Sequence, residues 1–319
     1  MIRSLDLGHS NDRVEDFDLK ETYFRFLRED PEMTMPVAAI ESLVVLLSNT
    51  KPSTSSELIQ ILAEATESLK KSVKNSISLS AGCDLFMRFV LRNVNQYGEW
   101  EACRSHLITN GRLFADRAKA SRNKIGEIGL PFIRDDDVIL VHSQSRAVIA
   151  LLTQAAKKYV RFRVYVTEAR RSDQGVKMAS VLRGEGIPVC VIPDSAVGYV
   201  IDKVDKVFFG AEGVAESGGV INEIGSYQVA VLAHNAHKPV YVVAESHKFV
   251  RLYPISPSDV PVEHPLEFSI DEPQSHEEII TASPQIDFTP HQFITALITD
   301  LGVLTPSGVS EELIKIWYD

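Results

Sequence analysis

The first part of the chain places its apolar residues at helical spacing. The segment 17–30 carries an apolar stripe, and Asp18 stands where it can cap the start of a helix. Pro36 opens a second segment whose apolar residues recur at intervals of three and four. A third helix is expected to be capped by Ser55 or Ser56. Similar segments follow up to residue 130, so the spacing predicts an N-terminal helical domain, a bundle without strands, over residues 1–130.

After residue 131 the period changes. Short apolar runs rich in β-branched residues occupy residues 138–142, 162–167, 188–192, 206–210 and 239–245, and each of the first four is followed by a helix-like segment. This alternation is typical of a parallel sheet with helices on both faces, so the fold class is α/β, with a Rossmann-like, doubly wound domain over residues 131–319. The end of the chain predicts an edge segment at 286–290 and two closing helices around "LGVLTPSGVS".

Composition and charge narrow the class of protein. The chain has 319 residues, of which 45% are hydrophobic and 24% charged, as in ordinary globular proteins. Its net charge of −10 argues against direct binding of nucleic acid through phosphates. Three widely spaced cysteines fit a reducing compartment. The N-terminus lacks the features of a leader, and no window is apolar enough for a membrane span, so a cytoplasmic protein without a membrane partner is expected.

One basic cluster stands out against the negative net charge. The sequence "KKYVRFR" at 157–163 is read as the solvated end of a helix that runs into a strand, and less readily as a binding patch.

Polar side chains follow the predicted strands. In an open parallel sheet, ligands bind beyond the carboxyl ends of the strands. The residues found there include His142, Ser143, Ser145, Arg146, Glu168, Arg170, Asp194 and Glu212. Taken singly, such residues more often cap the following helix, but together they favour a polar pocket.

Several common sites are disfavoured. The turn "HSQSRAV" lacks the glycines of a dinucleotide fingerprint, and no phosphate-cradling loop motif occurs, although a phosphate could dock at the helix start 143–146. His234 and His237 have no carboxylate or thiolate beside them, so no metal is expected. The chain has no G-x-S-x-G elbow for a serine triad, and burial is the better reading of Cys83. No cofactor is required.

The run "GAEGVAESGGVINEIGSYQVAVLAHNAHKPVYVVAESHKFVRLYP" at 210–254 closely resembles the alpha-subunit family of eukaryotic translation initiation factor 2B. The resemblance extends to "EDPEMTMPVAAIESLVVLL", "SRNKI", "VYVTE", "DSAVGYV" and the ending "FTPHQFITALITDLGVLTPSGVSEELIKIWY". The same superfamily contains isomerases of methylthioribose-1-phosphate and ribose-1,5-bisphosphate. The resemblance implies a helical domain followed by a Rossmann-like domain.

The resemblance also implies which residues stand at the isomerase positions. Ser143 occupies the place of a catalytic cysteine, and Glu212 the place of an aspartate that transfers protons. A serine is a weaker nucleophile without an activating base, and an added methylene displaces the carboxylate. We therefore expect no catalytic residue and no catalysis.

The isomerase pocket could survive as a site for phosphate or a sugar phosphate. The resemblance places at this pocket Glu168, Gln174, Gly175, Asp194, Glu212 and Asn222, with Arg146, Arg170 and Lys248 as candidate phosphate partners. Glu223, however, replaces a lysine that would favour a phosphate.

The function implied is that of a regulatory subunit of the initiation factor 2B guanine-nucleotide exchange complex. The implied partners are a second copy in a homodimer, the beta, gamma, delta and epsilon subunits, and initiation factor 2, especially its phosphorylated alpha subunit. The loop residues Thr54, Ser55, Ser56 and Glu57 are candidates for the regulatory surface, although helix capping is at least as good an explanation of them. The alternatives are an active sugar-phosphate isomerase and a sugar-phosphate-binding sensor.

Overall fold

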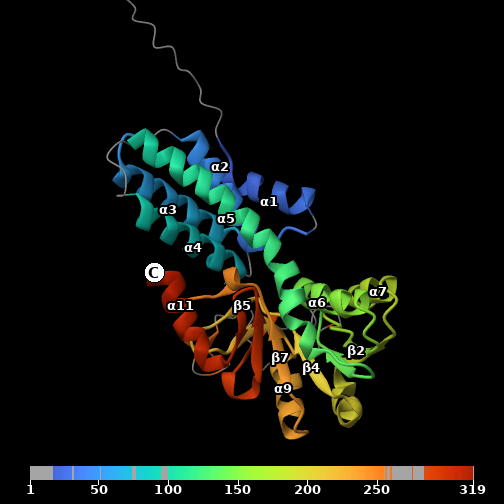
Figure 1. The fold of residues 1–319 in the computed structure, drawn as a ribbon. Coiled ribbons are helices and arrows are strands. Elements are labelled where there is room, and N and C mark those ends of the chain that lie inside the picture. The colour runs from blue at the N-terminus through green and yellow to red at the C-terminus, as the bar shows by residue number, and fades with distance from the viewer. Residues whose placement is uncertain are drawn as a thin grey trace, which may run out of the picture.

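The computed structural model describes residues 17–30, 32–50, 52–73, 77–94, 100–254, 256, 259–260, 275 and 284–318. Its first part is helical and consists of Leu19–Glu29 (α1), Met35–Asn49 (α2), Ser55–Lys71 (α3), Ile77–Asn93 (α4) and Trp100–Gly129 (α5). Figure 1 shows these helices side by side above the sheet, with the long α5 running down from the bundle to the sheet. Asp18 caps α1 as predicted, accepting a hydrogen bond from the Glu21 N–H at 3.0 Å.

One predicted cap is wrong by one position. Thr54, and not Ser55 or Ser56, is the N-cap of α3, where its hydroxyl accepts a hydrogen bond from the Glu57 N–H at 3.2 Å. A β-branched hydroxyl serves as well as serine at this position, because the cap needs only an oxygen two or three residues before the free N–H.

The helical bundle packs closely at one glycine. Side chains such as Tyr23, Leu43, Phe86 and Leu107 are fully or almost fully buried in its core. At Gly82 of α4, a Cβ atom would lie 2.5 Å from the Pro36 carbonyl oxygen at the start of α2. Helices α2 and α4 therefore touch through their backbones.

The second part contains a seven-stranded sheet. Its strands are Val138–Val141 (β1), Arg163–Thr167 (β2), Val189–Ile192 (β3), Lys206–Phe209 (β4), Val240–Val243 (β7), Ala296–Thr299 (β9) and Gly302–Leu304 (β10). The order is β10-β9-β7-β4-β1-β2-β3, and only β10 pairs in the antiparallel sense. The five predicted apolar runs are all strands, and the predicted α/β class with a mostly parallel sheet is confirmed.

The strand order reverses direction at β1. Val141 lies opposite Val166 of β2 on one side and opposite Phe208 of β4 on the other. The connections from β1 and β4 therefore leave in opposite directions, which opens a crevice at the carboxyl ends of these strands.

Helices cover both faces of this sheet. The end of α5 packs with Arg146–Lys157 (α6) and Gln174–Gly184 (α7) against one face through side chains such as Ile125, Leu151 and Met178. Val197–Val200 (α8), Ser226–Asn235 (α9) and Val309–Tyr318 (α11) contribute Val197, Val229 and Val309 to a second core. Within the described residues, no helix is both long and apolar enough to cross a membrane.

A smaller sheet was not foreseen. Gly213–Val214 (β5), Val220–Glu223 (β6) and Ile286–Thr289 (β8) form it in the order β5-β6-β8. The segment between β4 and α9 thus forms the antiparallel pair of β5 and β6. The predicted edge segment at 286–290 is the outer strand β8 of this sheet, and the sheet packs under α4 through Ile77 and Phe288.

The prediction of two closing helices is wrong. The segment before the final helix forms the hairpin of β9 and β10. Among residues 284–318, only α11 is an α-helix. Pairing of Val242 with Leu297 and of Val243 with Ile298 places these apolar side chains in the sheet. Tertiary pairing has overridden a local helical spacing.

Replacement of Gly82 by alanine tests the contact between α2 and α4. The new methyl group would force the two helices apart, so Gly82→Ala should lower the free energy of unfolding by about 1–3 kcal/mol. Gly184→Ala is the control, because nothing lies within 4 Å of its Cβ position and it should be neutral or slightly stabilising. Chemical denaturation measures both, and equal effects would contradict the packing argument.

Candidate functional site

A polar hollow of about 640 Å³ lies where the helical part meets the carboxyl ends of the strands. Leu27, Glu32 and Met33 line it from the helical part. Ser145 and Arg146 follow β1, and Gly210 to Glu212 follow β4, so the hollow occupies the crevice at the reversal of strand order. Two of these segments approach closely, because a Cβ at Gly210 would lie 2.4 Å from the Ser145 hydroxyl.

The structure brings six of the twelve predicted pocket residues to this hollow. These are Ser145, Arg146, Gln174, Glu212, Asn222 and Lys248. The other six, which do not line it, are His142, Ser143, Glu168, Arg170, Gly175 and Asp194.

Several of those other residues have structural roles. Asp194 does not cap the helical turn that follows it, but accepts hydrogen bonds from the N–H groups of Ala169 and Arg170, both at 3.0 Å, and so orders the loop after β2. A Cβ on Gly175 would lie 1.8 Å from the Thr167 carbonyl oxygen, so only glycine fits there.

His142 is also held within the protein. Its Nδ1 lies 2.8 Å from the Thr167 hydroxyl and its Nε2 lies 3.0 Å from the Ile224 carbonyl oxygen. Burial lowers the pKa of this imidazole. Because both ring nitrogens have protein partners, His142 orients the segment after β1 and faces no open space.

Ser143 stands beside a carboxylate that the sequence did not assign to it. Its backbone has a φ of +58°, and its hydroxyl donates to Glu223 Oε2 at 3.2 Å. Ser172 donates to the other oxygen of the same carboxylate at 2.5 Å. Glu223 thus accepts hydrogen bonds from two serine hydroxyls and places a carboxylate at the edge of the hollow.

The cations of the hollow also have partners. Arg146 donates to the Met33 carbonyl oxygen at 2.8 Å, and Lys248 donates to the Ala211 carbonyl oxygen at 2.8 Å. Glu212 accepts a hydrogen bond from the Ser78 hydroxyl of α4 at 2.5 Å. Each of these bonds either joins the helical part to the sheet or fixes the rim of the sheet.

A buried carboxylate lies next to this rim. Glu245, which ends the segment of β7 and is 1% exposed, lies 3.4 Å from Arg122 Nε of α5 and 3.2 Å from Lys248 Nζ. Burial by itself would raise the pKa of Glu245, but Lys248, then His247, a backbone hydrogen bond and Arg122 together outweigh it, and the pKa falls to about 2. Arg122 also pairs with Glu32.

Sequence reasoning missed most partners from the helical part, among them Glu32, Ser78 and Arg122. A signal existed for Arg122 and Glu32, which lie in the motifs "SRNKI" and "EDPEMTMPVAAIESLVVLL" that carry the family resemblance. Nothing local marks Ser78 or Ser172, because their partners are far away in the chain.

The proposed regulatory loop forms a helix cap. In addition to the Thr54 cap, Glu57 Oε2 accepts a hydrogen bond from the Ser53 N–H at 2.7 Å. The two hydrogen bonds resemble a capping box, so helix capping explains these residues without a regulatory role. A regulatory role for residues 54–57 stays a prediction.

The described residues contain no cluster of three or more His, Cys, Asp or Glu side chains that could hold a metal ion. His234, one of the two histidines considered above, packs edge-on against Phe293 with ring centroids 5.3 Å apart. Cys83 is fully buried as expected, and burial raises the pKa of its thiol to about 12.

The fold of this chain, a helical bundle joined to a doubly wound sheet, is similar to that of solved structures. The chain resembles Pyrococcus horikoshii OT3 translation initiation factor eIF-2B, with a TM-score of 0.68 and 24% identity over 90% of this chain and 98% of that one. It also resembles a chain of the tetrameric eIF2B-beta2-delta2 complex from C. thermophilum, with a TM-score of 0.74 and 19% identity over 94% and 96%. At these identities the likeness concerns the fold.

Sequence comparison gives the family. A model described as the Initiation factor 2 subunit family matches residues 28–306. The chain is 39% identical to translation initiation factor eIF2B subunit alpha of Dictyostelium discoideum, over 95% of this chain and 98% of that protein. The corresponding Caenorhabditis elegans protein is 34% identical over 91% and 95%. Ribose 1,5-bisphosphate isomerase of Pyrococcus furiosus is 31% identical over 84% of each chain.

The chain belongs to the Initiation factor 2 subunit family. The names of its relatives support the role of a translation initiation factor subunit, and they include both subunits of eIF2B and isomerases.

Replacement of Glu245 by glutamine tests the buried ion group. The half-buried cations Arg122 and Lys248 would face an uncharged amide, so Glu245→Gln should lower the free energy of unfolding at pH 7 by about 3–5 kcal/mol. Glu216→Gln breaks an exposed ion pair with Arg251 and should cost less than about 1 kcal/mol.

The low pKa of Glu245 also predicts that the stability difference between wild type and Glu245→Gln depends on pH. The pKa of Glu245 is lower in the folded state, so its stabilisation is present above the ordinary pKa of 4.5 and is lost as the pH falls toward about 2. Over this window the gap between wild type and Glu245→Gln should shrink by about 3 kcal/mol. Urea titrations at several pH values measure it, and a gap that stays constant would show that Glu245 is not ionised in the folded protein.

Proposed function

We propose that this chain is a non-catalytic regulatory subunit of a translation initiation factor 2B guanine-nucleotide exchange complex. The observation that carries the proposal is the 39% identity to a named eIF2B alpha subunit, which spans nearly the full length of both chains. In the proposed role, the chain associates with beta, gamma, delta and epsilon subunits and contributes regulation.

The geometry of the hollow supports a role without catalysis. Ser143 and Glu212 stand at the positions that the isomerase resemblance associates with a nucleophile and a proton carrier. In this chain the Ser143 hydroxyl donates to Glu223, and the Glu212 carboxylate accepts from Ser78. A serine hydroxyl beside a single carboxylate lacks the stronger base that activates serine nucleophiles.

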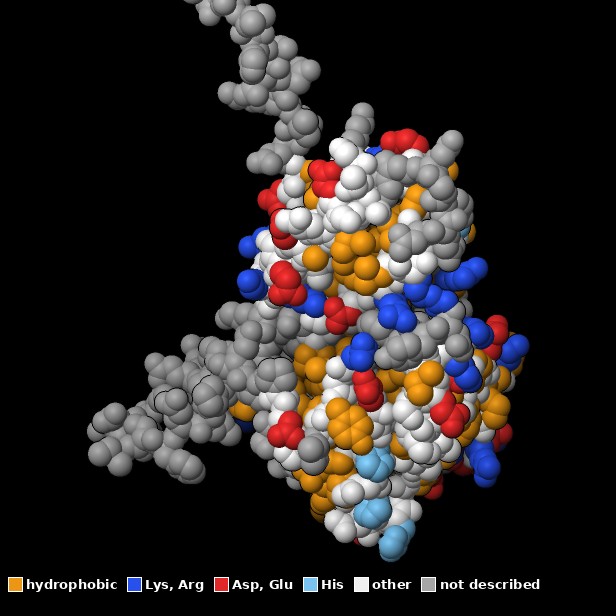
Figure 2. Space-filling model, turned by 90° about the vertical axis from the view of Figure 1, so that its left-hand side faces the viewer, with side chains coloured by type: hydrophobic (Ala, Val, Ile, Leu, Met, Phe, Trp, Pro, Cys, Tyr) orange, Lys and Arg blue, Asp and Glu red, His pale blue; other side chains and the backbone are white. Residues whose placement is uncertain are grey.

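We further propose that the sheet part mediates homodimerisation, and that the helical part faces initiation factor 2 and responds to phosphorylation of its alpha subunit. Figure 2 shows hydrophobic side chains spread over one face of the sheet part, and Tyr253 and Ile314 are among the exposed apolar residues of the chain. A coupling of about 1–3 kcal/mol between sites would give roughly 5–150-fold regulation.

A sugar-phosphate sensor is a second candidate, which the hollow itself favours. Its volume of about 640 Å³ is ample for a sugar phosphate, and Arg146 and Lys248 line it. Glu212 and Glu223 also line it, and they oppose an anion.

Affinity purification of the full-length chain from its own cells tests the main proposal. We expect four other subunits in fixed proportion, together with substoichiometric initiation factor 2, as measured by quantitative mass spectrometry. The recovered chain should sediment at twice its mass of 35.4 kDa when it is separated from the other subunits. Recovery of the chain without other subunits would contradict the proposal.

A turnover assay with ribose-1,5-bisphosphate, combined with calorimetry, separates the alternatives. No product is expected, because the resemblance puts Ser143 and Glu212 where the isomerases have a cysteine and an aspartate. Saturable binding without product would support the sensor, whereas product that is lost in Ser143→Ala would contradict the non-catalytic role.

A further inference from the structure

A short segment between β2 and α7, residues 168–173, lies beside the polar hollow. Its two ends adjoin, because the Gly175 N–H donates to the Glu168 carbonyl oxygen at 3.2 Å and a Cβ on Gly175 would touch the Thr167 carbonyl oxygen. A loop with adjoining ends has the outline of an Ω-loop, a type that is frequently functional. We call this segment the flap.

Little packing holds the flap in place. Its only apolar side chain, Ala169, is buried but belongs to none of the hydrophobic cores formed by the described residues. Arg170 and Asp173 are exposed. Segments with few buried apolar contacts open locally at a low cost in free energy, so the position of the flap depends on its hydrogen bonds.

Hydrogen bonds fasten the flap at its base and at its tip. At the base, Asp194 accepts bonds from two backbone N–H groups of the flap. At the tip, the Ser172 hydroxyl donates to Glu223 Oε1 at 2.5 Å, while the Ser143 hydroxyl donates to Oε2 of the same carboxylate. The tip therefore lies beside Ser143, and the flap contributes to the burial of this residue, which is 3% exposed.

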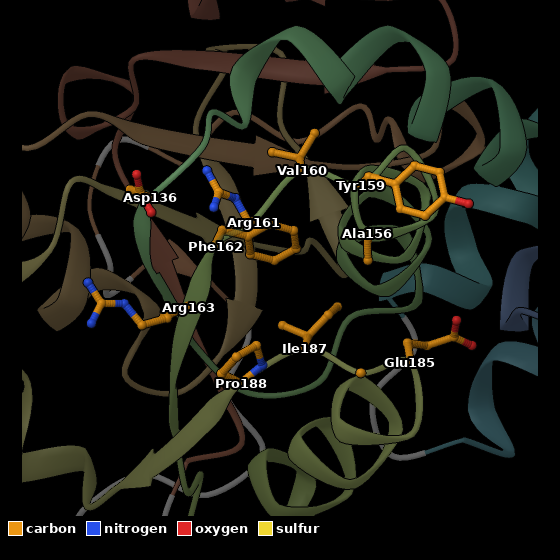
Figure 3. A pocket seen from close by; sticks show the side chains of 11 residues that line it. Asp136, Ala156, Tyr159, Val160, Arg161, Phe162, Arg163, Glu185, Ile187 and Pro188 are labelled. Atoms are coloured by element: carbon orange, nitrogen blue, oxygen red, sulfur yellow. The ribbon is translucent and has the colours of Figure 1, made fainter.

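Backbone strain gathers in and beside the flap. In the described part of the chain, six non-glycine residues have a positive φ, a conformation that is strained for a side chain. Tyr159 and His237 follow the ends of α6 and α9, and Asp136 precedes β1. Figure 3 shows Asp136 and Tyr159 around a separate hollow at the opposite rim of the sheet. The other three strained residues are Ser143, Ala169 and Asp173.

Asp173 shows what this conformation costs the flap. It is the N-cap residue of α7, but it has a φ of +53° and its side chain makes no capping hydrogen bond. An N-cap aspartate ordinarily has an extended backbone and accepts a bond from a free N–H of the first helical turn. Asp18 does so at α1, with a φ of −85°. Asp173 is therefore kept out of its favoured role while the flap tip is bonded to Glu223.

We propose that residues 168–173 form a flap with two states, which Glu223 latches closed over Ser143. In the closed state, the bond from Ser172 to Glu223 offsets the strain at Asp173. In the open state that bond is lost, Asp173 takes an extended backbone and caps α7, and the Ser143 hydroxyl joins the polar hollow beside Glu223. The latch lies within one chain, so it does not depend on the subunit role proposed above.

Limited digestion of the purified full-length chain with trypsin tests the latch. Arg170 and Arg171 offer cleavage sites within the flap. Because a protease cleaves a segment that has opened locally, the cleavage rate reports the population of the open flap. Ser172→Ala and Glu223→Ala each remove the latch bond and should raise the rate at these sites about tenfold. The double variant should be cleaved about as fast as Glu223→Ala, because both changes break the same bond.

A change at Asp173 should have the opposite effect. Glycine fits the left-handed backbone of the closed flap and cannot cap α7 in the open state, so Asp173→Gly should slow cleavage several-fold. Ser180→Ala is the matched control, since Ser180 is exposed on α7 and lies outside this group of hydrogen bonds, and it should be cleaved as the wild type is. Peptides of residues 165–178 from each variant correct for changes in the intrinsic rate of trypsin.

Three results would overturn the two-state flap. An unchanged cleavage rate in Ser172→Ala would show that the bond to Glu223 does not hold the flap closed. Faster cleavage at every site of the chain, together with a lower Tm, would show that Ser172 supports the whole fold and latches no local segment. Faster corrected cleavage in Asp173→Gly than in the wild type would show that Asp173 does not strain the closed state.

Discussion

A buried carboxylate between two cations holds the two parts of this molecule together. Glu245 follows β7, Arg122 reaches it from α5, and Lys248 lies on its other side. A buried charge without a partner costs several kcal/mol, so each member fixes the positions of the others. Lys248 also holds the Ala211 carbonyl oxygen at the rim. The shape of the polar hollow, and the position of the bundle above it, therefore depend on this group.

The sequence predicted the parallel strands well because their physics is local. A strand buried on both faces must read as a short apolar run, and five such runs in the second half of the chain marked the parallel strands. The prediction from sequence failed where pairing between strands that are distant in the chain decides the structure. The segments of β9 and β10 carry a spacing that also suits a helix, and only β7 beside them makes Ala296–Thr299 a strand. The short strands β5 and β6 depend in the same way on β8.

The residues of the candidate site were also predictable only where local sequence decides their position. Residues directly after strands, such as Ser145 and Arg146, could be placed because parallel strands end at one edge. The hydrogen-bond partners of these residues could not be placed from the sequence. The bond from Arg146 to the Met33 carbonyl oxygen and the bond from Ser78 to Glu212 exist only because the bundle settles onto that edge. A spacing rule carries no information on such contacts, and cations expected to be available for a phosphate prove to be engaged.

Helix α6 connects the two rims of the sheet. It begins at Arg146 in the polar hollow and ends at Lys157, two residues before Tyr159. Its 12 residues span about 18 Å, and its buried face is packed through Leu151 and Leu152. Helix α7 spans the same distance, since Gln174 at its start lines the polar hollow and Glu185 just after its end lies at the opposite rim.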